Sequence, residues 1–199
     1  MEAFIHGLAL AFGIILPMGV QNLFIFNQGI NQPSYFKALP AIITASVCDT
    51  VLIVVAVFLM SLMSELFESI KITLIIGGFF FLSYMGWVIW NTSCEDANKE
   101  PPASAKKQVF FALSVSLLNP HALLDTVGVI GTNSLLYTNI DKWFFMIAAI
   151  IVSWTYFFFI AFIGKIIGQK DKKYKFRIIF NKISALTIWF LAFYMLFML

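Results

Sequence analysis

Long apolar runs alternate with short polar segments along this chain. Each run is about as long as the roughly 20 residues that a helix needs to cross the hydrocarbon core of a bilayer. Asn119, His121 and Asp125 interrupt the fourth run, and without it only five helices would cross. The pattern predicts six transmembrane helices, at Phe4–Phe26, Ala38–Met63, Ile70–Trp90, Val109–Gly131, Trp143–Ile167 and Phe176–Leu199.

The composition agrees with a lipid environment. Hydrophobic residues make up 61% of the 199 residues and charged residues only 12%, whereas soluble domains average about 25% charged residues. We therefore expect an all-α integral membrane bundle that forms one transmembrane domain over residues 1–199. Its halves would be residues 1–92 and 108–199, joined by the polar loop 91–108. The sequence carries no signal for an oligomeric state.

The basic residues gather in alternate connections. Cytoplasmic loops of membrane proteins carry an excess of Lys and Arg, so we expect these loops in the cytoplasm, both termini outside, and a multi-pass protein of the cell membrane. The net charge is only +3, and no basic stripe is interleaved with aromatic residues, so no nucleic-acid partner is expected. The connections after the first, third and fifth runs, with their flanks, hold 11 of the 13 basic residues: Lys37, Lys99, Lys106, Lys107, Lys165, Lys170, Lys172, Lys173, Lys175, Arg177 and Lys182.

Prolines break the first and the fourth run. Pro17 and Pro120 each remove a backbone donor, and Asn119-Pro120 combines a favoured N-cap with the favoured first helical residue. The prolines lie 103 residues apart, at matching places in two sets of three helices. Three is an odd number, so the halves would insert with opposite orientations. This pattern is typical of transporters built from an inverted 3+3 repeat, although proline is also more frequent in membrane helices than in soluble ones.

Asp49 lies in the middle of the second run. A carboxylate at that depth costs at least about 2.5–3.5 kcal/mol on insertion scales, and such residues usually face a cavity and serve a function. Asp49 could pair with a substrate ammonium group or carry a proton. Alternatively, it could make a structural hydrogen bond to a neighbouring helix, for example to Gln21 or Asn22.

His121 and Asp125 form a second polar pair, because residues four apart share one face of a helix. They could relay protons or hold a cation, or make an interhelical contact near the outer interface. They are also the only acid–base pair that a membrane enzyme could use, but no nucleophile or metal motif accompanies them. We therefore expect no catalytic residue and no cofactor. We also expect no metal, since the spans contain no Cys/His cluster that could bind one.

Four motifs in the same order resemble the LysE-type amino-acid exporter family over essentially the whole chain, and within it the arginine/lysine exporter branch. They are Leu16-Pro17-Met18-Gly19-Val20-Gln21-Asn22, Asn27-Gln28-Gly29-Ile30, Ser46-Val47-Cys48-Asp49 and Leu118-Asn119-Pro120-His121-Ala122-Leu123-Leu124-Asp125. His121 stands where the branches for neutral amino acids tend to carry Lys. Pro17-Met18-Gly19-Val20 departs from the Pro-Gly-Pro that the family often shows.

The resemblance implies export of basic amino acids from the cytoplasm, driven by the membrane potential or the proton gradient, with a coupled proton or counter-ion. Export of a neutral amino acid or another small solute on the same fold is the alternative. The residues expected to bind substrate or couple transport are Pro17, Gln21, Asn22, Asp49, Asn119, Pro120, His121 and Asp125.

Overall fold

A computed structural model describes residues 1–16, 19–91, 102–171 and 175–196, and every regular element in these ranges is a helix. The elements, in chain order, are α1 (Glu2–Ile15), α2 (Val20–Asn31), the 3₁₀ turn η1 (Tyr35–Ala38), α3 (Leu39–Trp90), α4 (Ala105–Leu117), α5 (Pro120–Leu123), the π-helix η3 (Leu124–Gly131), α6 (Thr132–Ser134), α7 (Asn139–Lys170) and α8 (Lys175–Leu196).

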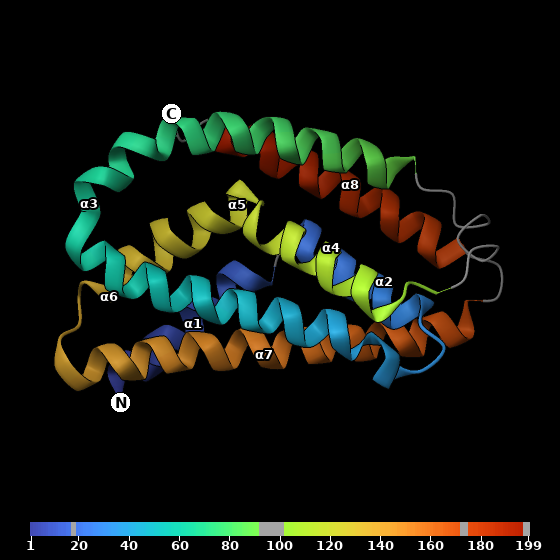
Figure 1. Ribbon diagram of the computed structural model, residues 1–199, viewed down its shortest axis with the longest axis horizontal. Coiled ribbons are helices and arrows are strands. Elements are labelled where there is room, and N and C mark those ends of the chain that lie inside the picture. The colour runs from blue at the N-terminus through green and yellow to red at the C-terminus, as the bar shows by residue number, and fades with distance from the viewer. Residues whose placement is uncertain (17–18, 92–101, 172–174, 197–199) are drawn as a thin grey trace.

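The second and third predicted helices are one continuous helical element. The sequence places a connection between these two helices, from Met63 to Ile70, and in the structure α3 is helical through it, from Leu39 to Trp90. The intervening residues include neither Gly nor Pro, so nothing in the sequence ends the helix there. The ribbon of α3 nevertheless turns at the left of Figure 1, and its second half runs back along the molecule.

Two helices of the described chain are long and apolar enough to cross a bilayer, Tyr35–Phe58 and Asn139–Lys170. The first and fourth predicted helices are bent pairs, with angles of 77° between α1 and α2 and of 60° between α4 and the helical segment His121–Ser134. If each bent pair forms one span, the number of crossing helices rises to four. Two shorter apolar helices lie within the third and sixth predicted runs, at Ile75–Trp90 and Ile178–Tyr194.

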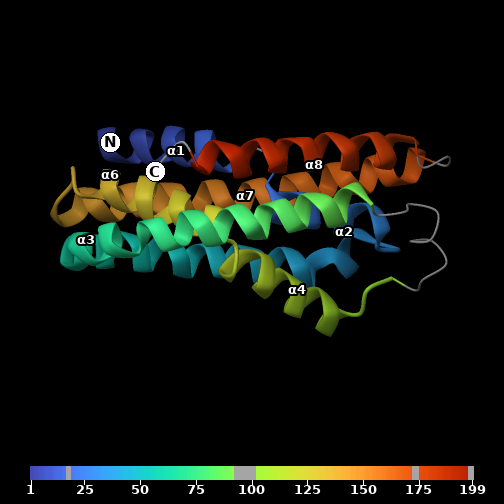
Figure 2. The same ribbon diagram turned by 90° about the horizontal axis from the view of Figure 1, so that it is seen from above.

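The two broken helices pack on two different straight helices. Both α1 and α2 lie against α7, whereas α4, α5 and η3 lie against α3. Glycines make the closest approaches, because Gly29 of α2 lies against the backbone of Ala161 and Gly164 of α7 against that of Phe26. The first half of α3 runs along α7, and α8 pairs with the second half of α3 (Figure 1). Figure 2 shows α1 and α8 on one side of the bundle and α4 on the other.

Hydrogen bonds join two polar connections, the one after α2 and the one before α4, to each other and to α7 at one end of the bundle. The Lys165 ammonium group of α7 donates to the carbonyl groups of Gln32 (2.6 Å) and Pro33 (3.0 Å), which follow α2. The Gln32 side chain donates to the Ala103 carbonyl (3.0 Å), and Gln108 of α4 donates to the Lys37 carbonyl (3.0 Å). In Figure 1 this end is on the right, whereas α1 begins and α8 ends towards the left.

Candidate functional site

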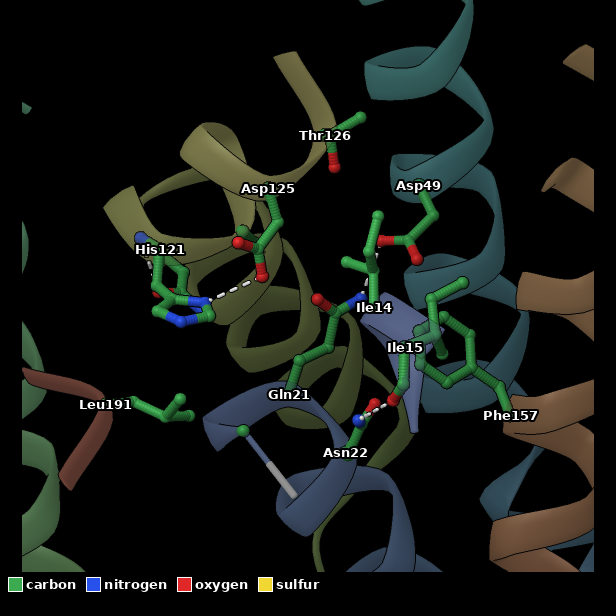
Figure 3. A pocket seen from close by; sticks show the side chains of 13 residues that line it. Ile14, Ile15, Gln21, Asn22, Asp49, His121, Asp125, Thr126, Phe157 and Leu191 are labelled. Carbon is green, nitrogen blue, oxygen red and sulfur yellow. Dashed lines mark hydrogen bonds and ion pairs between the residues drawn. The ribbon is translucent and has the colours of Figure 1, made fainter. Parts of the chain in front are cut away.

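A partly open cavity lies between the two helix breaks (Figure 3). It offers about 80 Å³ to molecules the size of water. Six of the eight predicted site residues line it, although they come from three segments of the chain that are far apart in the sequence, residues 21–22, 49 and 119–125. The lining residues are Ile14, Ile15, Gly19, Gln21, Asn22, Asp49, Asn119, His121, Ala122, Asp125, Thr126, Phe157 and Leu191.

Asp49 of α3 is half-buried, and its carboxylate is held by two other helices. The Gln21 amide of α2 donates to Asp49 Oδ1 at 2.9 Å, and the Ser153 hydroxyl of α7 donates to Asp49 Oδ2 at 2.8 Å. Hydrogen bonds to a carboxylate are among the stronger ones in proteins. The interhelical bond to Gln21, considered from the sequence as the structural alternative, is therefore present, and the same carboxylate also faces the cavity (Figure 3).

Side chains satisfy the backbone where the first helix breaks. The last carbonyl groups of a helix lack partners within it, and in a membrane they must find partners in the protein or in a wet cavity. The Ile15 carbonyl accepts from the Asn22 amide at 2.7 Å, and the Leu16 carbonyl accepts from the Tyr156 hydroxyl at 3.2 Å. Pro17, predicted as the cause of this break, lies outside the described residues.

The second break follows the predicted capping pattern. α4 ends at Leu117, and α5 begins at Pro120. The side chain of Asn119 is buried, and its Oδ1 accepts from the backbone N–H of His121 at 3.2 Å. Asn119 therefore binds one of the backbone donors that a helix leaves free at its start. Residues on both sides of each helix start line the cavity, Asn119 and His121 at α5 and Gly19 and Gln21 at α2.

His121 and Asp125 face each other across one helical turn. Their Nδ1 and Oδ2 atoms are 2.9 Å apart, as the spacing of four residues predicts. The π-helix that begins at Leu124 was not predicted, because its pattern of apolar residues resembles that of an α-helix. Such wide turns are rare and often occur at functional sites. Here the π-helix carries Asp125 and Thr126 on the cavity wall.

The cavity combines negative charge with backbone donors. Two carboxylates, Asp49 and Asp125, and one histidine line it, together with no lysine or arginine from the described residues. The start of a helix presents free N–H groups and the positive end of its dipole. Carboxylates attract cations, so one small cavity offers partners for both signs of charge. Within the described ranges, no group of three or more His, Cys, Asp or Glu side chains could hold a metal ion.

Two polar residues of α7 contribute contacts that sequence reasoning missed. Ser153 bonds to Asp49, and Tyr156 bonds to the end of α1. Both lie inside a long apolar run, where isolated hydroxyl groups are common and carry no functional signal of their own. The only hint in the sequence is the distance of Ser153 from Asp49 along the chain, which is close to the distance between the two prolines.

The chain matches the family model of the LysE type translocator over residues 12–199. It is 50% identical over 195 residues to the proposed amino-acid transporter YisU of Bacillus subtilis (strain 168), covering 98% of this chain and 89% of that protein. It is 29% identical to the arginine exporter protein ArgO of Serratia proteamaculans (strain 568), over 96% of this chain and 95% of the relative.

The arginine exporter protein ArgO of Escherichia coli (strain K12) is also 29% identical, over 95% of this chain and 90% of that protein. No solved structure matches. The family model covers nearly the whole chain, including both helix breaks and all the residues that line the cavity. The chain therefore belongs to the LysE type translocator family, whose members are membrane transporters and not enzymes.

Proposed function

We propose that this protein exports basic amino acids, arginine and lysine, from the cytoplasm across the cell membrane. The observation that carries the proposal is the charge of the cavity, which two carboxylates line without a lysine or arginine from the described residues. Such a lining favours a cationic cargo over an acidic one. The relatives named as arginine exporters support the same cargo, at 29% identity.

Each charged group of a basic amino acid has a partner in the cavity. The starts of α2 and α5, marked by Gly19 and Asn119, suit the substrate carboxylate, because helix starts favour anions. Asp49 and Asp125 suit its two cationic groups. Gln21 holds the Asp49 carboxylate, His121 holds that of Asp125, and Asn22 holds the carbonyl group at the end of α1. The proposed set of site residues is completed by Pro17 and Pro120.

The cavity is too small for this cargo in the conformation described. Its volume of about 80 Å³ holds a few water molecules, whereas pockets for small organic ligands typically measure about 300–1,000 Å³. The substrate would therefore enter through a rearrangement of the helices around the cavity. The two breaks are the natural hinges, because a few residues at helix ends absorb most of such movements.

Export of a cation against an outside-positive potential needs an energy source. The potential opposes exit by about 2.3 kcal/mol per charge per 100 mV. We propose that a proton or counter-ion entering the cell drives export through the proton gradient or the membrane potential, with Asp49 as the carrier. Its carboxylate lies in the cavity and accepts hydrogen bonds from two other helices, α2 and α7, so a change in its charge would affect both of them.

We propose that six spans form two inverted halves, residues 1–92 and 108–199, joined by the loop 91–108. The packing supports this arrangement. The broken first helix lies on α7 of the second half, and the broken fourth helix lies on α3 of the first half. Exchanging the halves would exchange these two pairings, as a two-fold axis in the membrane plane requires.

The proposed topology predicts where the chain ends. A reporter enzyme that works only outside the cytoplasm, fused after Leu199, is expected to be active, because the basic loops would be cytoplasmic and both termini external. The same reporter inserted after Glu100 serves as the control and is expected to be inactive. A cytoplasmic C-terminus would contradict the six-span topology.

The proposed cargo predicts a pattern of efflux. Cells that contain the protein, preloaded with labelled arginine, lysine, leucine or threonine, are expected to lose arginine and lysine faster than cells without it. Leucine and threonine are expected to leave at equal rates from cells with and without the protein, because neither has a side-chain cation that could pair with a carboxylate of the cavity. Faster efflux of leucine or threonine alone would favour a neutral cargo, and no difference for any of the four would reject amino-acid export.

A further inference from the structure

Two neighbouring hydrogen bonds join α3 and α7 beside the cavity. The buried hydroxyl of Ser153 donates to Asp49 Oδ2 at 2.8 Å, and the indole N–H of Trp154 donates to the hydroxyl of Thr50 at 2.9 Å. In both pairs the partners lie 104 residues apart in the sequence. The two bonds thus join neighbouring residues of α3 to neighbouring residues of α7.

That separation nearly equals the offset between the proposed halves. Pro17 and Pro120, which mark the two helix breaks, lie 103 residues apart. With that offset Asp49 matches Val152, so Ser153 lies one residue beyond the place that matches Asp49 in the second half. A residue can contact its own counterpart only where the two-fold axis passes between them. The bond between Asp49 and Ser153 would then lie close to the axis that relates the halves.

The direction of the Ser153 bond is unusual for a hydroxyl group in this bundle. Most helical hydroxyl groups donate to the carbonyl of their own helix four residues earlier, as Thr155 does to Ile151 (2.7 Å) and Thr50 does to Ser46 (2.8 Å). Ser153 instead donates across to a carboxylate of another helix. Its side chain therefore fixes the position of Asp49 rather than satisfying its own helix.

We infer that Ser153 is a positioning residue for Asp49 and, one residue from the matching place, its polar counterpart in the second half of the protein. It holds one carboxylate oxygen while the Gln21 amide holds the other, which fixes the plane of the carboxylate at the cavity. The inference rests on the proposed function, in which Asp49 binds the cationic substrate or carries the coupled proton. By this inference, the hydroxyl group of Ser153 in the second half stands beside the place that matches the carboxylate of Asp49 in the first half.

Removing the hydroxyl tests the positioning role. Ser153→Ala is expected to raise the KM for arginine or lysine efflux about ten-fold, since a hydrogen bond to a charged group is lost. Ser153→Cys, which keeps a weak donor of similar shape, is expected to lie between Ala and the wild type. The matched control is Ser184→Ala, which alters another buried serine, in α8, away from the cavity. Its KM is expected to equal that of the wild type, with all rates normalised to the protein found in the membrane.

Exchanging the two side chains tests the counterpart role. Asp49→Ser alone is expected to lose at least nine-tenths of the efflux, and Ser153→Asp alone is expected to be impaired, because two carboxylates would touch. The double variant Asp49→Ser/Ser153→Asp returns a single carboxylate to nearly the same point, and we expect it to export several times faster than Asp49→Ser. A double variant that is present in the membrane but exports no faster would overturn the counterpart assignment.

The two tests also separate this inference from the proposed function. If the wild type exports neither arginine nor lysine, the proposed function fails before any variant is compared. If the wild type exports but Ser153→Ala keeps the wild-type KM, the positioning role is overturned while the proposed function stands. If Ser153→Ala is missing from the membrane, the purified Ser153→Cys protein tests the same role. Arginine binding is then followed as a rise in Tm, and an affinity equal to that of the wild type would contradict the positioning role.

Discussion

Asp49→Asn is expected to reduce the efflux of arginine and lysine on the order of 30-fold or more. The substitution keeps the shape of the side chain but removes its charge, and its amide group would face the donors that now bind Asp49, from Gln21 and Ser153. In the proposed function Asp49 pairs with a cationic group of the bound substrate. Losing one member of such a charged pair typically costs about 2–5 kcal/mol, and each 1.4 kcal/mol corresponds to a factor of ten. Initial rates of efflux from preloaded cells or vesicles measure the effect.

The same variant also tests the coupling role of Asp49. In vesicles with an imposed pH gradient, export by the wild type is expected to respond to the gradient and export by Asp49→Asn is not. Asp141→Asn is the matched control, because Asp141 is an exposed carboxylate in the first turn of α7, away from the cavity. If Asp49→Asn kept full export and an unaltered response to pH, Asp49 would not be the coupling site.

Gly29→Ala is expected to destabilise the fold strongly, although it adds only one methyl group. A Cβ atom at this position would overlap the backbone of Ala161, which belongs to a helix and cannot turn away. Overpacking of a core typically costs about 1–3 kcal/mol, and contact with backbone places this site at the upper end. We expect a fall in Tm of several degrees, together with less protein in the membrane.

Gly13→Ala provides the control for Gly29→Ala within the same broken helix. A Cβ added at Gly13 would meet nothing within 4 Å beyond its chain neighbours and the backbone of its own helix, and alanine favours a helix more than glycine does. Its Tm is therefore expected to equal or exceed that of the wild type. Thermal unfolding of the two purified variants in the same detergent makes the comparison, and equal Tm values would show that α2 and α7 are packed less tightly than described.

Local features of the site follow from the sequence because they depend on neighbours along the chain. The N-cap at Asn119 and the helix start at Pro120 follow from local backbone chemistry, and the structure has both. The contact between His121 and Asp125 follows from the helical repeat and is also present. The apolar runs indicate a lipid environment for the same reason, since each is judged by its own length and composition.

Long-range contacts were decided only by the tertiary structure. Which side chain would hold Asp49 depended on how α2 and α7 pack on α3, and the apolar run around Ser153 gave no sign of it. The π-helix after Leu123 likewise depends on packing, because its residues also suit an α-helix. Sequence patterns predicted the polar residues one at a time, whereas their meeting in one cavity required helices from both halves of the chain to fold together.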